Sequence, residues 1–142
     1  MDTVNSDVIN YLQSIGCGSF GTDLFFGRVP QSAKTPVDLW WVVPNSSNVT
    51  QHNVSGEDTI EYHYELYYRS MSVQKISEKL FQASKEIVGS HCYNLDNFHT
   101  IEVKLESVNQ PTLKDSEERL IGNIVFTVTV YNILEPKEKE SS

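Results

Sequence analysis

The chain has 142 residues, which is the usual size of a single domain. Hydrophobic residues make up 39% of it and charged residues 21%, a composition that argues against disordered, collagen-like and disulfide-rich classes. The chain has 11 Lys and Arg and 19 Asp and Glu, so its net charge at pH 7 is −8. Sequence-independent binding of nucleic acid needs clustered cations, and the composition therefore argues against tight DNA binding by this chain alone.

Targeting and membrane segments are not expected. The first residues, MDTVNSDVINYL, have neither a basic segment nor an apolar core, so they do not resemble a signal peptide. The longest charge-free stretch, 120–134, is too short for a membrane helix, and no membrane partner is predicted. The sequons at Asn45, Asn48 and Asn53 are then interpreted as a polar loop rather than as glycosylation sites. The sequence predicts a soluble, acidic protein made inside the cell.

Two segments have helical periodicity. Residues 4–15 place apolar side chains on one face, and Gly16 is a natural end for this helix. Residues 72–88 show the stronger pattern, with Ser72 or Ser70 as the N-terminal cap and Gly89 as the end. The apolar positions of this second helix are Val73, Ile76, Leu80, Ala83 and Ile87.

Five segments are predicted to be strands. They are 23–29, 37–43, 60–69, 101–106 and 124–131, the last three with strict alternation of side-chain character. The polar segments 44–58 and 107–118 are predicted to be long hairpin loops. If the stretch 120–134 were wholly extended it would span roughly 50 Å, against an expected radius of gyration of about 14–15 Å. We therefore expect either a break at Gly122 and Asn123 or a strand that projects onto a partner.

These elements predict an α+β fold. It has a twisted, mostly antiparallel sheet of about five strands with two helices packed on one face, in the order α-β-β-β-α-β-β. Residues 1–134 form the single domain, and the charged tail 135–142 is expected to be disordered. The residues expected in the core are Ile76, Leu80, Ile87, Ile124, Phe126 and Val128.

No catalytic, metal-binding or cofactor-binding motif in the sequence lies between the secondary-structure elements that it requires. Residues 16–21 match the glycine pattern of dinucleotide-binding loops, but a helix precedes them and a strand follows, so we interpret them as a connector. Cys17 and Cys92 are predicted to be free thiols, because paired-cysteine metal spacing and a secretion signal are both absent. We accordingly predict no catalytic residue, no metal site and no cofactor.

The polar side of the 60–69 strand is the candidate interface, together with the 44–58 loop and the far end of the last strand. Of the adjacent tryptophans, one is expected in the core, and the other is expected either to be covered by a helix or to anchor an interface; sequence alone does not say which. The candidate interface residues are Trp41, Asn45, Asn53, Glu61, His63, Glu65, Tyr67, Arg69, Thr129 and Tyr131.

From residue 23 to residue 132, the chain resembles the tail-terminator and minor-capsid (tail-completion) proteins of long-tailed bacteriophages. The likeness rests on LFFGRVP at 24–30, on Tyr68-Arg69-Ser70 closing a long alternating strand, on the amphipathic helix that follows and on the Thr-rich last strand. The 44–58 segment has no counterpart in that pattern. The resemblance implies an α+β fold without catalytic residues.

It further implies a homo-oligomeric ring, typically a six-fold ring, at the head-proximal end of the tail in the virion. The implied partners are other copies of the chain, the major tail tube protein and the head connector or head-completion protein, with DNA only passing through the channel. Two other hypotheses stay open. One is another head–tail connector or tail-completion subunit, and the other is a ferredoxin-like domain that binds a small ligand or acts as an enzyme.

Overall fold

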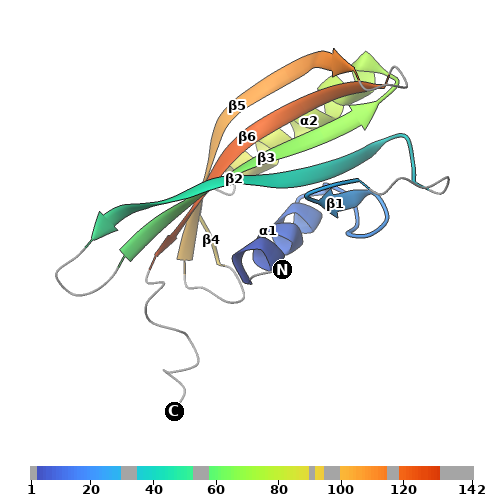
Figure 1. Cartoon of the computed structure of the whole chain (residues 1–142). Coiled ribbons are helices and arrows are strands. Elements are labelled where there is room, and N and C mark those ends of the chain that lie inside the picture. The colour runs from blue at the N-terminus through green and yellow to red at the C-terminus, as the bar shows by residue number, and fades with distance from the viewer. Residues whose placement is uncertain are drawn as a thin grey trace.

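The computed structural model describes residues 3–29, 35–52, 58–89, 92–94, 100–114 and 119–131. The described residues form two helices and one sheet, whose arrangement can be followed in Figure 1. The sheet has six strands in the spatial order β1-β2-β3-β6-β5-β4, and only β1 and β2 run parallel. This confirms the predicted α+β class and element order, to which the short β4 adds a sixth strand. The elements are α1 (Thr3–Ser14), β1 (Leu24–Phe26), β2 (Leu39–His52), β3 (Asp58–Ser70), α2 (Val73–Gly89), β4 (Cys92–Asn94), β5 (Thr100–Lys114) and β6 (Leu120–Tyr131).

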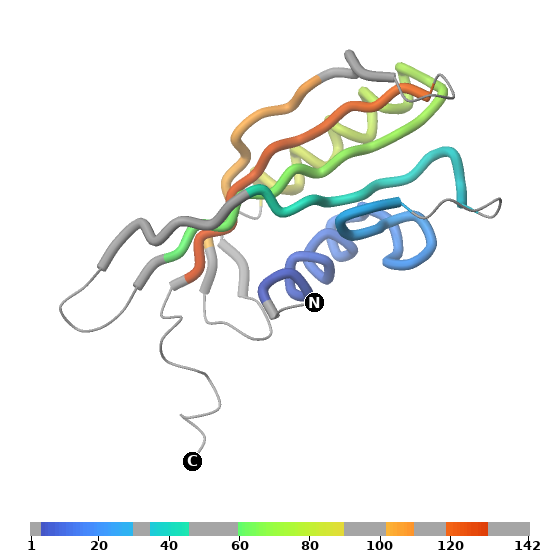
Figure 2. The backbone as a smooth tube through the Cα atoms, viewed as in Figure 1, coloured from blue at the N-terminus to red at the C-terminus, as the bar shows by residue number. Residues whose placement is uncertain are grey.

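The two helices cover the same face of the sheet. Helix α2 lies against β3, β6 and β5, while α1 lies beside β2 and β1 (Figure 1 and Figure 2). Tyr64 of β3 links its face to α1, because its hydroxyl donates a hydrogen bond of 2.7 Å to Asn5 Oδ1. Side chains of both helices and of this sheet face form one buried cluster. The core therefore sits between a helix layer and one face of the sheet, as the sequence predicts.

The alternation along β3 sets which side chains enter the core. Tyr64, Leu66 and Tyr68 are buried against the helices, while Glu65 and Tyr67 lie on the other face. All six residues predicted to form the core are fully buried. Val73, predicted on the apolar face of α2, is instead 54% exposed, because it is the first residue of the helix and projects beside the sheet rather than onto it.

The prediction that residues 44–58 form a loop is wrong for residues 44–52. There β2 continues as a strand and pairs with β3 as far as His52 opposite Asp58. A polar segment forms this strand because pairing with β3 satisfies its backbone groups, although its side chains show no apolar alternation. Irregularities between Pro44 and Ser46 and between Val49 and Gln51 adjust the register.

The second predicted loop, 107–118, is also too long. Strand β5 continues to Lys114 opposite Leu120, with irregularities between Leu105 and Ser107 and between Asn109 and Leu113. The irregularity expected at Gly122 and Asn123 is absent from the pairing of β6 with β3, but the pairing of β6 with β5 is irregular there, because its register skips Gly122. The predicted tail 135–142 lies outside the described residues.

The glycine-rich connector follows α1, as predicted. Cys17 N–H donates to Leu12 O and Gly16 N–H to Gln13 O, which is the Schellman arrangement, with Gly16 at a φ of 94°. A Cβ on Gly18 would lie 2.7 Å from Asp23 Oδ1, and the same oxygen accepts a hydrogen bond of 2.6 Å from Ser19 N–H. The glycines thus shape a turn between α1 and β1. Among the described residues, no helix is long and apolar enough to cross a membrane.

Candidate functional site: the open face of the sheet

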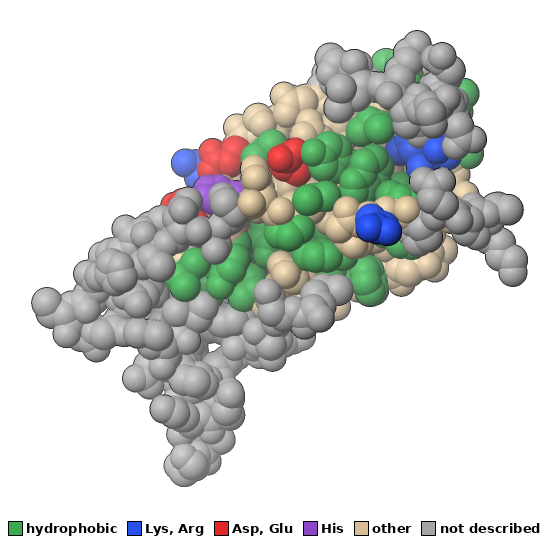
Figure 3. Space-filling model, in the orientation of Figure 1, with side chains coloured by type: hydrophobic (Ala, Val, Ile, Leu, Met, Phe, Trp, Pro, Cys, Tyr) green, Lys and Arg blue, Asp and Glu red, His purple; other side chains and the backbone are tan. Residues whose placement is uncertain are grey.

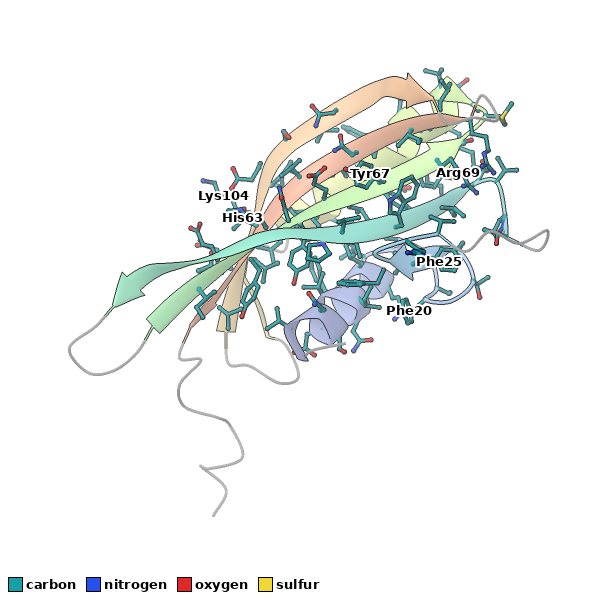
Figure 4. The ribbon with its side chains drawn as sticks, viewed as in Figure 1. Phe20, Phe25, His63, Tyr67, Arg69 and Lys104 are labelled. Carbon is teal, nitrogen blue, oxygen red and sulfur yellow. The ribbon has the colours of Figure 1, made fainter. Side chains whose placement is uncertain are left out.

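The face of the sheet opposite the helices is only partly covered, and we call it the open face. In Figure 3, hydrophobic side chains gather over β2, β3 and β6, with acidic side chains and a histidine at one end. Cross-strand register places these half-buried apolar side chains on the open face: Phe25, Trp41, Val43, Tyr67, Ile121 and Val125. Figure 4 shows His63, Tyr67 and Arg69 spaced along β3, with Lys104 of β5 near His63.

The structure resolves the roles of the two tryptophans. Trp40 is buried in the core, where its ring lies 4.6 Å from that of Tyr68. Trp41 lies on the open face and stacks on Tyr67, with ring centroids 5.0 Å apart and ring planes 12° apart. Such an aromatic pair contributes about 0.5–1.5 kcal/mol beyond its buried area. The pair forms a rigid apolar surface that remains half-exposed.

Glu65 is the hydrogen-bond acceptor beside this stack. The Tyr67 hydroxyl donates to Glu65 Oε2, and the side-chain amides of Asn45 and Asn123 lie 3.5 Å from Oε1 and Oε2 of the same carboxylate. Burial, followed by the hydrogen bond and the negative charge of Glu65, raises the pKa of Tyr67 to about 12. Tyr67 is therefore a neutral donor at physiological pH.

A second polar cluster surrounds His63. Its Nδ1 lies 3.1 Å from Thr127 Oγ1, and the Thr127 hydroxyl donates a hydrogen bond of 3.0 Å to Glu106 Oε2. With its own proton committed to Glu106, Thr127 accepts from His63 Nδ1–H, which leaves Nε2 facing Glu61 Oε1 at 3.6 Å. The buried Thr127 hydroxyl is thus occupied on both sides and is not arranged as a nucleophile.

The prediction that Arg69 is an exposed interface residue is wrong, because its side chain is buried. Its Nε donates a hydrogen bond of 2.9 Å to Val37 O, and its Nη2 donates one of 2.8 Å to Pro36 O. The segment before β2 folds over this end of β3, and a strand's alternation pattern contains no information about such a cover. Arg69 therefore anchors the entry to β2 instead of binding a partner.

We expect Arg69→Met to lower the free energy of unfolding by about 1.5–3 kcal/mol, because both carbonyls lose a charged donor. Methionine keeps most of the volume of the side chain. Arg28→Met is the matched control, since Arg28 is exposed, and it should change stability by less than about 0.5 kcal/mol. Urea unfolding followed by circular dichroism measures both variants. Equal stability of the two variants would show that the Arg69 hydrogen bonds do not hold the segment.

The other predicted interface residues either lie on the open face or fall outside the part of the chain that the structure describes. Trp41, Asn45, Glu65 and Tyr67 come together in one cluster, and Thr129 lies on the open face opposite Glu61. Asn53 lies outside the described residues, as does the side chain of Tyr131. The site members that sequence analysis missed are Phe25, Glu106, Asn123 and Thr127. The alternation of 124–131 places Thr127 on the polar side, but only the pairing of β6 with β3 and β5 brings it to His63.

The raised pKa of Tyr67 gives a pH prediction. The unfolded tyrosine loses its proton near pH 10 and the folded one near 12, so stability is fully present below pH 10 and falls as pH rises towards 12. Glu65→Gln should lower the pKa of Tyr67, because it removes the negative charge. Ultraviolet titration of tyrosinate, with Tyr67→Phe to assign the late-titrating group, measures this. An unchanged titration in Glu65→Gln would contradict the role of Glu65.

A cavity of about 280 Å³ lies between the end of α1, β2 and α2. Cys17, a free buried thiol, lines it together with Lys79, Lys85 and Glu86. Burial raises the pKa of Cys17 to about 12, so the group stays a neutral thiol and is a poor nucleophile. Within the part of the chain that the structure describes, no group of three His, Cys, Asp or Glu side chains is placed to hold a metal ion.

Compared with known proteins, the sequence matches no family model and no curated protein.

Proposed function

We propose that this chain is a structural protein of a long-tailed bacteriophage, a tail terminator whose copies form a ring. The ring caps the tail tube and joins it to the head connector. The observation that carries the proposal is the open face, where the Trp41–Tyr67 stack stays half-exposed beside hydrogen-bonded acidic side chains. Rigid aromatic anchors with a polar surround are typical of surfaces that bind other proteins.

The charge of the chain fits the passage of DNA through such a ring. Each copy has a net charge of −8, and a ring of acidic copies repels the phosphates of DNA moving through its channel. The acidic side chains of the open face, Glu61, Glu65 and Glu106, add to this local field. Tight adhesion of DNA to the ring would obstruct ejection, so an acidic surface suits the role.

Binding of a small ligand is the second candidate, and the cavity near Cys17 is the observation in its favour. Ligand pockets usually measure about 300–1,000 Å³, so a cavity of about 280 Å³ is at the low end. Its thiol is neutral and buried, and its charged groups have mixed sign. The open face carries a stacked aromatic pair suited to binding a protein, and for this reason the proposal rests on it.

The decisive experiment deletes the gene for this chain from the phage genome that encodes it. We expect tails of abnormal length and heads that remain separate from tails in electron micrographs. Wild-type protein supplied in trans should restore joining, whereas Trp41→Glu should not, because it replaces the aromatic anchor by a charge. Gln82→Glu adds the same charge on the exposed side of α2 and is the control that should restore joining. Tails of normal length joined to heads without the protein would refute the proposal.

A further inference from the structure

Helix α2 carries a stripe of exposed apolar side chains, with the Lys85 ammonium 5.8 Å from the centre of the Phe81 ring. Val73, Phe81 and Val88 are 54%, 64% and 58% exposed. At 100° per residue they lie within about 80° of one another around the helix, and the residues between them on this stripe are Ser77 and Ser84. Large apolar side chains gathered on one stripe mark an interaction surface more strongly than the same residues scattered singly.

The position of the cavity fixes the direction in which this stripe points. Lys79, Gln82, Lys85 and Glu86 line the cavity next to α1. Of these, Lys79 and Glu86 lie closest to the core-facing residues around the helix, so they mark the side of α2 that faces α1. The stripe lies on the opposite side of the core-facing residues. Since α2 rests on β3, β6 and β5, with α1 beyond it towards β2, the stripe faces the β5 edge of the sheet (Figure 1).

That edge of the sheet is itself open. Strand β5 pairs with β6 along its length, but β4 covers its outer side only opposite Thr100, Ile101 and Glu102. From Val103 onward, no described strand pairs with that outer side. Val108 pairs opposite Ile124, whose side chain is in the core, and is 36% exposed at this edge. From Val103 to Asn109 the β5 edge thus presents backbone groups that no described strand pairs, next to an apolar border that suits strand addition. Beyond this stretch, Pro111 has no N–H to donate.

The other edge of the same sheet is open as well. Strand β1 covers β2 only opposite Trp40, Trp41 and Val42. From residue 43 to residue 52, no strand in the described part of the chain pairs with the outer side of β2. Two open edges at opposite ends of one sheet allow copies to join head to tail.

The net charge of these two edges is not negative, unlike that of the whole chain. Copies with a net charge of −8 repel one another, and most of their surface contributes to this repulsion. The open part of β2, residues 43–52, contains no Asp, Glu, Lys or Arg. The open part of β5, residues 103–114, contains two lysines and one glutamate. Repulsion between copies is therefore smallest where these two edges meet, and the uncharged β2 edge lacks the charges that usually protect an edge strand.

We propose that the β5 edge, bordered by the α2 stripe, binds the open β2 edge of a second copy of this chain and continues the sheet from copy to copy. A head-to-tail contact of this kind forms a ring when the rotation between successive copies closes. This contact deepens the proposed function, on which it rests for its biological setting, because it names the surfaces that build the ring.

Two charged double variants test the contact. Phe81→Lys with Val108→Lys charges the β5 edge, and Asn45→Lys with Asn48→Lys charges the β2 edge. The Asn45 side chain lies beside Glu65, and the strand register pairs residue 48 with Glu61, so we expect the new charges to be compatible with folding. We expect each variant to raise the dissociation constant of self-association at least about tenfold in analytical ultracentrifugation. Asn10→Lys with Gln82→Lys adds the same charge at exposed positions elsewhere and should leave it within about twofold of wild type.

Mixing the two edge variants tests the head-to-tail geometry. The β5 variant keeps an intact β2 edge and the β2 variant keeps an intact β5 edge, so the mixture should form a one-to-one dimer and nothing larger. Its mass is twice that of one 16.2 kDa chain. A β2 variant that dimerises alone would show symmetric β5 pairing and overturn the proposal. Wild-type protein that stays monomeric at about 1 mM would overturn it too.

These outcomes are separable from the deletion experiment. A mixed dimer together with normal tails in the deletion phage would leave the contact in place and refute the tail-terminator function. Failed head joining in the deletion phage, with edge variants that associate like wild type, would refute the contact and leave the function. Thermal unfolding of each variant confirms that it is folded, since Phe81 and Asn45 are exposed.

Discussion

We expect Leu80→Ala to lower the free energy of unfolding by about 2–5 kcal/mol, the usual cost of emptying a buried leucine position. Leu80 is fully buried on the core face of α2, where the helix crosses the sheet at Gly122. Both contacting surfaces belong to regular elements that cannot collapse freely into the space, so the cost should fall in the upper half of that range. Urea unfolding monitored by circular dichroism and tryptophan fluorescence measures it.

Gln82→Ala is the control for this substitution, because Gln82 is exposed on the same helix. It should change stability by less than about 0.5 kcal/mol. A loss below about half a kcal/mol for Leu80→Ala would show that α2 does not pack on the sheet through this face.

Gly122→Ala should also destabilise the protein, by about 1–3 kcal/mol, through crowding rather than through a cavity. A Cβ at Gly122 would lie 2.8 Å from Leu80 Cδ1, 2.9 Å from Ile76 Cγ2 and 3.2 Å from Asn109 O. The first two distances are too short for a contact between carbons, so the Leu80 and Ile76 side chains must move, and the contact with the Asn109 carbonyl is tight. The same unfolding measurement applies, with Gly89→Ala as the control because a Cβ there meets nothing within 4 Å.

The two substitutions should be coupled. In the double variant, the methyl group that Gly122→Ala adds enters space that Leu80→Ala has vacated, so the loss should be smaller than the sum of the two single losses. Strictly additive losses would contradict the close approach of α2 to β6 at this point. The cycle thus tests the helix–sheet contact independently of either single value.

The sequence predicts the core well and the long strands poorly. Burial imposes a pattern on residues such as Ile76, Leu80 and Phe126, and that pattern is visible without a structure. The polar run after Pro44 has no such pattern, since its strand conformation depends on pairing with β3 and not on its own side chains. Propensity favours a loop there, and long-range hydrogen bonding overrides it.

For the candidate site, the sequence identifies the right strand but not its neighbours. Alternation along β3 places Glu65 and Tyr67 on the face away from the core, as observed. The partners Asn123 and Thr127 come from β6, far along the chain, and depend on a register that sequence alone does not define. Arg69 shares the alternation of its neighbours and is buried by a segment that precedes β2.

The placement of β6 between β3 and β5 has a consequence for synthesis on the ribosome. The last of the six strands to emerge is a central one, and until Leu120 and the residues after it are available, β3 and β5 have no common neighbour. The apolar surface of β3 and β5 then stays exposed until β6 has been synthesised, a state that favours aggregation and requires late, long-range pairing. A stop codon anywhere before residue 120 therefore removes the middle of the sheet rather than its margin, and the earlier strands should not survive as a folded remnant.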